Sequence, residues 1–178
     1  MGRQVRTVTA GSRSARIQGL VAEQAARRGG RVSVLDVCAA AVAALPVGGA
    51  GVSAMSRSSA SNPLCSTDTI SERLEELQLT LGEGPCVDAF AFGGAVLTPD
   101  LRADDAHARW PVFAPAAEQA GAGAVFAFPL QIGAISPGVL DMYATTPYIT
   151  SKTRRFGTWH LDTEPPDGQA VGRLRMAA

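Results

Sequence analysis

The sequence predicts an α+β fold, with an antiparallel sheet that has helices on one side and across its ends. The first observation is the order of elements, because short apolar or alternating runs are interspersed with stretches of helical periodicity. The second is length, since 178 residues can form one domain with a genuine core and terminal extensions. We expect that domain at 14–150, between a mobile basic arm at 1–13 and an irregular tail at 151–178.

Two helices are expected before the sheet. Apolar residues follow helical spacing at 14–28, and a Gly-Gly pair ends this first helix. The second helix begins at Ser33, with Asp36 three positions later, and ends before Pro46. Cys38 lies on its apolar side, so we expect a small buried core residue there.

The first two strands of the sheet lead into the most informative helix of the chain. Thr69 and Glu72 suit a capping box at its start. An apolar stripe with helical spacing runs along it, formed by Ile70, Leu74, Leu77 and Leu81. The intervening polar residues are expected to face solvent, and they include Glu72, Arg73, Glu75, Glu76 and Gln78.

A glycine break separates this helix from a second one that extends to Phe92. Gly82 and Gly84 suit the break, and Pro85 suits the first position of the new helix. Cys86 would therefore lie in the first turn, where exposed amides and the helix macrodipole favour a thiolate.

Five short strands make up the expected sheet. Their ranges are 50–57, 61–67, 95–98, 124–132 and 139–145. Residues 101–109 are expected to be a polar loop, and Trp110 to open another helix. The last two strands are the most apolar, so we expect them to form the central hairpin, with a turn at 136–138.

Composition and charge exclude several classes of protein. The 16 basic and 16 acidic residues balance, although both ends of the chain are basic and its middle is acidic. The longest apolar run, at 37–47, is too short to span a bilayer, and no secretory signal follows the basic N-terminus. Three cysteines without a Cys-x-x-Cys pair argue against a disulfide framework or a structural zinc site. We expect a cytoplasmic protein that does not associate with membranes.

Four segments carry a resemblance to a known family. They are V-C-A-A-A-V-A-A-L-P at 37–46, N-P-L-C-S-T-D at 62–68, L-T-L-G-E-G-P-C-V-D-A-F at 79–90 and R-W-P-V-F at 109–113. The chain from about Ile17 to Tyr148 resembles the GAF domain, and more narrowly the GAF half of the GAF–ANTAR regulators of actinobacteria. The resemblance implies a sheet of five to six strands flanked by helices, a small-ligand pocket or its vestige, and dimerisation through terminal helices.

In those regulators a C-terminal ANTAR domain binds RNA hairpins and prevents transcription termination. Residues 151–178 show no helical stripe and are too few for that helical bundle, so we do not expect RNA binding by this chain. The tail fits a stand-alone sensor domain or an altered reading of a longer chain, and the sequence leaves both open. Without the family's C-terminal helix, apolar residues on the first helix would find a partner chain, which predicts a homodimer. They are Ile17, Leu20 and Val21.

The expected function is that of a non-catalytic regulatory or sensory domain, derived from an antitermination regulator, that binds a small ligand or a protein partner. A pocket on the sheet would have aromatic walls and a few polar groups. The candidates are Phe90, Trp110, Phe113, Phe126, Phe128 and Tyr143, with Ser53 and Asp141 as polar groups. Alternatively, these aromatic residues simply fill the core. No cofactor is predicted, and the ligand is not identified.

A thiol-dependent reductase is the alternative function. GAF-fold enzymes that reduce free methionine sulfoxide use cysteines, and Cys86 with Cys65 is the candidate pair here. Their spacing does not match the pattern of those enzymes. No metal site is predicted, because the only two histidines, His107 and His160, lack a spacing typical of metal ligands.

Overall fold

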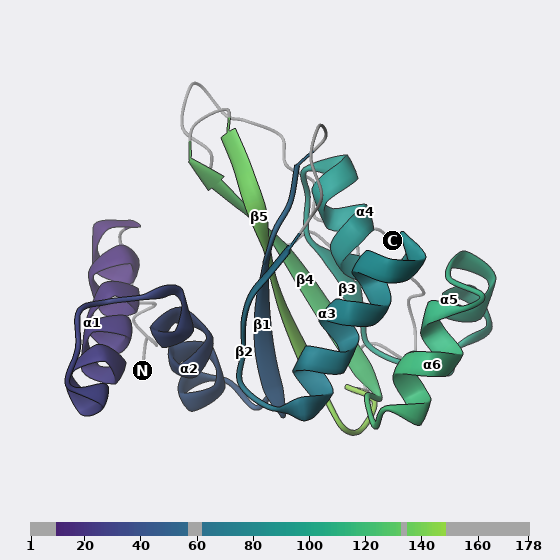
Figure 1. The fold of residues 1–178 in the computed structure, drawn as a ribbon, viewed down its shortest axis with the longest axis horizontal. Helices are drawn as coiled ribbons and strands as arrows, with labels where there is room; N and C mark the ends of the chain where they lie inside the picture. The colour runs from purple at the N-terminus through teal and green to yellow at the C-terminus, as the bar shows by residue number, and fades with distance from the viewer. Residues whose placement is uncertain (1–9, 57–61, 133–134, 149–178) are drawn as a thin grey trace, which may run out of the picture.

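The fold is a five-stranded antiparallel sheet with helices on both faces (Figure 1). The computed structural model describes residues 10–56, 62–132 and 135–148. The helices are α1 (Ala10–Arg28), α2 (Val34–Ala44), α3 (Thr69–Leu81), α4 (Pro85–Phe92), α5 (Asp104–Arg109) and α6 (Phe113–Gln119). The strands are β1 (Gly49–Ala54), β2 (Asn62–Ser66), β3 (Val96–Thr98), β4 (Ala124–Ile132) and β5 (Ile135–Ala144). Helix α1 begins at Ala10, inside the expected arm at 1–13, and 1–9 and the expected tail at 151–178 lie outside the described residues.

The strands lie in the order β2-β1-β5-β4-β3, and every neighbouring pair is antiparallel. As predicted, β4 and β5 form a hairpin with β5 at the centre of the sheet. The predicted turn at 136–138 is wrong, because these residues belong to β5 and the hairpin pairing continues to Ile132 opposite Ile135. The Pro-Gly pair indicates a turn, but Gly138 instead allows a close approach between β5 and β1. A Cβ there would overlap the Ser53 carbonyl oxygen of the neighbouring strand.

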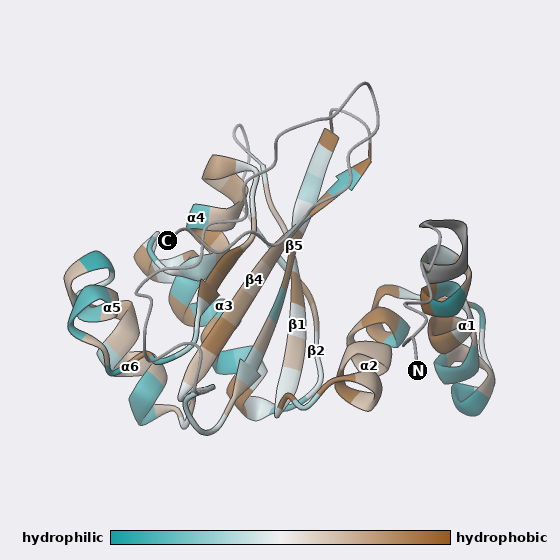
Figure 2. Ribbon diagram, turned by 180° about the vertical axis from the view of Figure 1, so that it is seen from behind, coloured by the Kyte–Doolittle hydropathy of each residue, from teal (hydrophilic) through white to brown (hydrophobic). Residues whose placement is uncertain are grey.

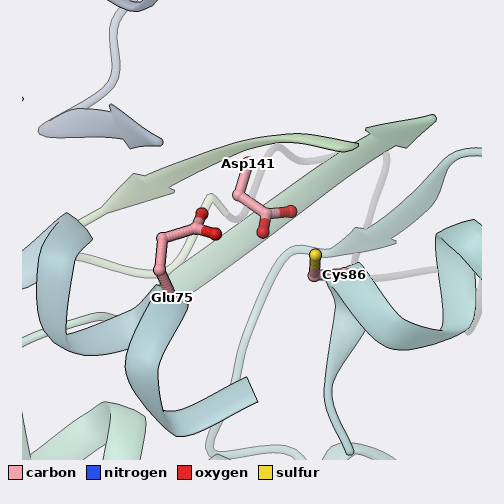
Figure 3. Close-up of side chains that lie close together, drawn as sticks. All are labelled: Glu75, Cys86 and Asp141. Atoms are coloured by element: carbon pink, nitrogen blue, oxygen red, sulfur yellow. The ribbon is translucent and has the colours of Figure 1, made fainter. Parts of the chain in front are cut away.

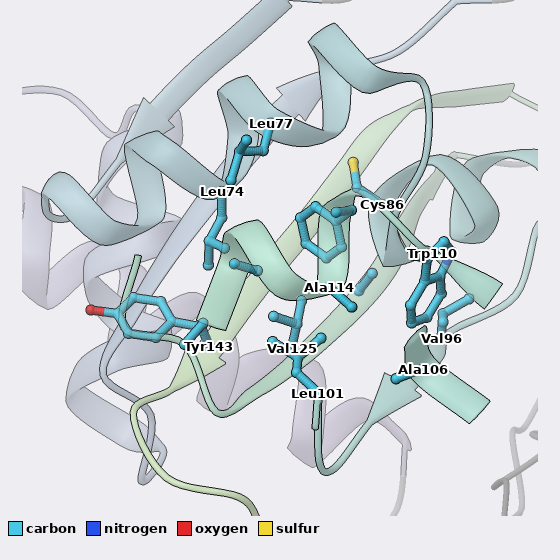
Figure 4. Packing of buried hydrophobic residues seen from close by; sticks show 14 of the residues in the cluster. Leu74, Leu77, Cys86, Val96, Leu101, Ala106, Trp110, Ala114, Val125 and Tyr143 are labelled. Carbon is cyan, nitrogen blue, oxygen red and sulfur yellow. The ribbon is translucent and has the colours of Figure 1, made fainter. Parts of the chain in front are cut away.

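Alternation along the strands divides the core between two faces, so the expectation of helices on one side is wrong. Helices α3, α4, α5 and α6 cover one face, where they enclose residues such as Leu101, Val125 and Tyr143 (Figure 4). Helix α2 covers β1 and β2 on the opposite face, where Cys38 packs with Val52. Helix α1 packs on α2 (Figures 1 and 2), and its hydrophilic turns contrast with the more hydrophobic sheet.

The polar residues at the helix starts fix two of the helices. The Ser33 amide donates to Asp36 Oδ2 at 2.7 Å, as expected for a capping box at α2. At α3 the expected Thr69–Glu72 capping box is wrong, because Asp68 is the N-cap. The Asp68 carboxylate accepts from the Ser71 amide at 2.8 Å, so Thr69 already belongs to the helix. The glycine break after α3 and Pro85 at the start of α4 are confirmed.

Helix α3 buries more of its circumference than its apolar stripe predicts. Leu74 and Leu77 are buried as expected, whereas Leu81 is exposed. Glu75 and Gln78 were expected to face solvent, and both are buried. The reason is that α3 contacts β1 and β2 on one side and α4 and α6 on others, so residues beside the stripe are covered as well.

The segment that was expected to be a polar loop contains the short helix α5, whose Ala106 is buried. Trp110 ends α5 rather than opening a helix, and α6 begins at Phe113. The Glu83 carboxylate fixes that start, because it accepts from the amides of Val112 and Phe113 at 2.7 and 2.6 Å. None of the helices in the described ranges combines the length and hydrophobicity needed to cross a bilayer.

A disulfide joins Cys38 of α2 to Cys65 of β2. The expectation that the cysteines form no disulfide is therefore wrong, although Cys38 is fully buried as predicted. The pairing follows from the packing of α2 over β2, which sequence spacing alone does not reveal.

Candidate functional site

A cluster of buried polar side chains lies where α3 and the start of α4 meet the central strands (Figure 3). Its members are Ser53 of β1, Glu75 and Gln78 of α3, Cys86 of α4 and Asp141 of β5. Each is at most 4% exposed. We call these five residues the buried polar cluster, and it is the strongest candidate for a functional site in the described residues.

Local sequence features bring these side chains together. Glu75 and Gln78 are three positions apart, so they lie on the same side of α3. Gly51 pairs with Asp141 across β1 and β5, and a Cβ on Gly51 would meet Glu75 Oε1 at 2.5 Å. The glycine therefore leaves room for the glutamate side chain above the sheet.

Gln78 connects α4 to the central strand. Its Oε1 accepts from the Cys86 amide at 2.7 Å, and its Nε2 donates to Asp141 Oδ2 at 3.1 Å. Gly84 takes a φ of 127° just before α4, where an added Cβ would meet Gln78 Cγ at 2.7 Å. On the other side of the cluster, the Ser53 hydroxyl donates to Glu75 Oε2.

Burial raises the pKa of both acidic groups of the cluster, and the rise is larger for Glu75 than for Asp141. At Glu75 the charge of Asp141 adds to the rise, and the Ser53 hydrogen bond partly opposes it. Burial also raises the pKa of Asp141, and its neighbours Cys86, Glu75 and Gln78 partly offset that rise.

The expected thiolate at Cys86 is wrong. Cys86 does lie in the first turn of α4, but it is fully buried. Burial raises the pKa of its thiol, and the charges of Asp141 and Glu75 raise it further. These effects outweigh the helix macrodipole, so Cys86 is a protonated thiol in this setting.

One acceptor of the cluster lacks a partner. Asp141 Oδ1 is buried and has no hydrogen-bond partner among the described residues. Beside it lies a cavity of about 10 Å³, which has room for about one water molecule. The cavity is lined by Gly51, Ser71, Leu74, Glu75, Val125, Asp141, Met142 and Tyr143. The space under the sheet is therefore small and polar at one end.

The structure does not bring the eight predicted pocket residues together. Ser53 and Asp141 belong to the buried polar cluster. The aromatic residues on the same face of the sheet fill the core or pack against it, and they are Phe90, Trp110, Phe113 and Tyr143. Phe126 and Phe128 lie on the opposite face of the sheet, which α2 covers. There Phe128 packs against the core around Cys38.

The two cysteines of the predicted redox pair lie on opposite faces of the sheet. Cys86 belongs to the core under α3 and α4. Cys65 packs on the α2 side and is already bonded to Cys38. The geometry therefore does not unite them in one cleft.

Sequence reasoning missed Glu75 and Gln78 as members of the buried polar cluster. The ligand atoms of Glu75, Cys86 and Asp141 lie within 4.8 Å of one another. A signal was present, because Glu75 and Gln78 each directly follow an apolar stripe residue and so border the buried side of α3. Of the two histidines, His107 contacts Glu118 at 2.6 Å, and His160 lies outside the described residues.

A larger groove lies at the surface, between the edge strand β2 and the start of α3. Its volume is about 490 Å³. Residues 63–67 form one wall, and the other carries the carboxylates of Asp68, Glu72 and Glu76. This groove was not expected from the sequence.

Similar solved structures include three proteins, each 14% identical to this chain. The A. aeolicus nlh2 GAF domain in an inactive state has a TM-score of 0.49, and the match covers 80% of this chain and 86% of that one. The free methionine-R-sulfoxide reductase of Neisseria meningitidis, in complex with its substrate, has a TM-score of 0.44 and coverage of 86% on both sides. A nitrate-binding-site mutant of NreA from Staphylococcus aureus has a TM-score of 0.37 and covers 57% of this chain and 76% of its own.

No protein-family model matches the sequence, and no curated protein matches it significantly. The function must therefore be inferred from the chain's own geometry.

Proposed function

We propose that this chain is a non-catalytic regulatory domain of the GAF type, which dimerises through its N-terminal helices and binds a small ligand or a protein partner. The observation that carries the proposal is the apolar surface of α1 and α2. Helix α1 packs against α2, and α2 lies between α1 and the sheet in Figure 1. Such a helical pair has an outer side that a second copy can cover.

The exposed apolar side chains of this surface are numerous. Ile17 of α1 and Val32 before α2 are each 61% exposed. Val34, Leu35 and Leu45 are also exposed on or beside α2, and Leu20 and Val21 of α1 are half-buried. Burying these side chains against a second copy would be favourable by about 25 cal/mol for each Å² of apolar area.

Among the described residues, the groove between β2 and α3 offers a place for a small ligand. Its volume of about 490 Å³ lies within the range of about 300–1,000 Å³ that is usual for ligand pockets. Asp68, Glu72 and Glu76 on its wall favour a ligand or peptide with cationic groups. By contrast, the cavity under the sheet is too small for anything larger than water.

The dimer is tested by light scattering at micromolar concentration. We expect the unaltered protein to be a dimer and Ile17→Asp with Leu35→Asp to be a monomer with the same circular dichroism spectrum. Val112→Asp is the matched control, since Val112 is equally apolar and exposed but lies far along the chain, next to α6. A monomeric unaltered protein would refute dimerisation.

The reductase alternative is tested with a thiol reagent on the native protein. A reductase needs a reachable thiolate, whereas Cys86 is buried and Cys65 is in a disulfide. We expect Cys86 to react only after unfolding. Rapid alkylation of native Cys86 would favour the enzyme instead.

Descent from an antitermination regulator is a part of the proposal that rests on the sequence motifs. A cytoplasmic location rests on composition, and the Cys38–Cys65 disulfide argues against it because disulfides are rare in a reducing compartment. The same motifs carry no RNA-binding element, so we expect no retardation of an RNA hairpin at low salt. Retardation that weakens steeply as salt is added would instead support nucleic-acid binding by the basic ends of the chain.

A further inference from the structure

We propose that Glu75, Cys86 and Asp141 form a binding site for one divalent transition-metal ion, with Zn²⁺ as the representative cation. The three side chains come from α3, α4 and β5, and their ligand atoms lie within 4.8 Å of one another (Figure 3). This site is independent of the dimer contact and of the groove between β2 and α3.

The donor set fits an ion of borderline softness. Two carboxylates and one thiolate are ligands that Zn²⁺ accepts, whereas Mg²⁺ and Ca²⁺ prefer oxygen ligands alone. Three protein ligands leave one position of a tetrahedral site for water. The cavity of about 10 Å³ that Glu75 and Asp141 both line is the place for that water molecule.

An independent observation favours a cation at this place. Asp141 is 4% exposed, and its Oδ1 has no hydrogen-bond partner among the described residues. In Figure 3 its carboxyl group lies between Glu75 and Cys86. Buried polar atoms are normally satisfied, and a buried carboxylate normally has a cationic partner.

That partner does not come from a basic side chain of the described residues. Their ion pairs involve other acids, such as Asp36 with Arg28 and Asp88 with Arg109. A metal ion would supply the positive charge that the protein around the cluster does not.

The chemistry of binding balances as a proton exchange. The ion forms bonds to Cys86 Sγ and to oxygens of Glu75 and Asp141. The Cys86 thiol and the Glu75 carboxyl group each release a proton to solvent, and no oxidation or reduction takes place.

Neighbouring groups are placed to orient the ligands. Gln78 Nε2 donates to Asp141 Oδ2 at 3.1 Å, and the Ser53 hydroxyl donates to a Glu75 oxygen. Such outer hydrogen bonds hold metal ligands in position, and their loss typically weakens metal binding by about 10–100-fold.

The test uses Co²⁺ as a spectroscopic probe on the full chain, after removal of metal with a chelator. We expect a thiolate-to-cobalt charge-transfer band that saturates at one ion per chain and disappears when Zn²⁺ is added. Glu75→Gln and Asp141→Asn should each weaken binding by at least about 10–100-fold, and Cys86→Ser should abolish the band. Asp36→Asn is the matched control, since Asp36 is a buried acid outside the cluster, and it should leave the affinity unchanged.

The titration of the unaltered protein is decisive even if a variant fails to fold. The absence of a band, together with an unchanged melting temperature in Zn²⁺, would overturn the proposal. A band that survives in Cys86→Ser but is lost in the Cys38→Ser, Cys65→Ser double variant would also overturn it, because the metal would then bind the other two sulfurs. Neither result would affect the dimer proposal, which light scattering tests separately.

Discussion

Replacing Gln78 by leucine should destabilise the fold, because two buried hydrogen bonds are lost. Gln78 is fully buried, accepts from the Cys86 amide and donates to Asp141 Oδ2. Leucine has a similar size, so the packing changes little. The Cys86 amide and Asp141 Oδ2, however, would remain buried without a hydrogen-bond partner. Each unsatisfied buried group costs about 1–3 kcal/mol, which gives a total of about 2–6 kcal/mol.

The assay is urea denaturation followed by far-ultraviolet circular dichroism, with the free energy of unfolding extrapolated to water. Gln131→Leu is the matched control. Its side chain also forms one hydrogen bond, from Nε2 to the Gly93 carbonyl at 3.1 Å, but it is exposed. This control should change stability by no more than about 0.5 kcal/mol. A cost below about 1 kcal/mol for Gln78→Leu would show that water or backbone movement replaces the lost bonds, and it would refute the bridging role.

Three further predictions concern other parts of the chain. Glu83→Ala should cost about 0.5–2 kcal/mol in urea denaturation, because two amides at the start of α6 lose their acceptor. The Arg28 guanidinium holds the pKa of Asp36 well below its ordinary value of 3.8, so this pair stabilises the fold above that pH and the stabilisation is lost as the pH falls through the folded pKa. Asp36→Asn should therefore flatten the acid side of the stability profile. Replacing Cys38 and Cys65 by serine should cost up to roughly 3–4 kcal/mol under non-reducing conditions, given a separation of 27 residues.

Each of these has an outcome that contradicts it. Glu83→Gln should retain part of the cap, so equal losses in the alanine and glutamine variants would argue against a hydrogen-bonding role. An acid profile identical for Asp36→Asn and the unaltered protein would exclude the Arg28 pair as its cause. If the double serine variant and the unaltered protein differ equally with and without reductant, the disulfide is not the origin of the difference.

The parts of the fold that sequence predicted are those with local signals. Gly82 and Pro85 mark the break between α3 and α4 because their backbone preferences act within one or two residues. The predicted range of β4 agrees with the observed strand at both ends, since its apolar run is bounded by glycine and a change of polarity. The Pro-Gly signal at 136–138 failed because Gly138 serves a close approach to β1, which is a tertiary contact.

Only part of the site was predictable, because local signals identify some of its residues and tertiary contacts determine the others. Ser53 and Asp141 stand out as polar residues in strands that are otherwise apolar or small, so sequence identified them. Glu75 and Gln78 border the apolar stripe of α3, but polar residues at such positions usually face solvent, and their burial depends on how α4 and α6 pack around α3. Cys86 was placed correctly in α4, but its protonation state depends on burial and on two acids distant in sequence.

The two acids of the buried polar cluster also affect the stability of the metal-free fold. Replacing buried ion pairs with uncharged residues of similar volume is often neutral or stabilising, by about 1–4 kcal/mol, because the desolvation cost disappears, and the same cost applies to buried acids without a cationic partner. We therefore expect the metal-free double variant Glu75→Gln, Asp141→Asn to be at least as stable as the unaltered protein at neutral pH. The amide oxygen introduced by Asp141→Asn could still accept from Gln78, so the link to α4 would remain.

The same variant should lose any rise in melting temperature on addition of Zn²⁺. Thermal denaturation with and without the ion measures both effects on one sample, and Asp36→Asn again serves as the control for a buried acid outside the cluster. A double variant that is several kcal/mol less stable than the unaltered protein would mean that the acids hold the fold together. A stable double variant that no longer responds to Zn²⁺ would mean that their arrangement serves the ion, since the fold does not require their charge.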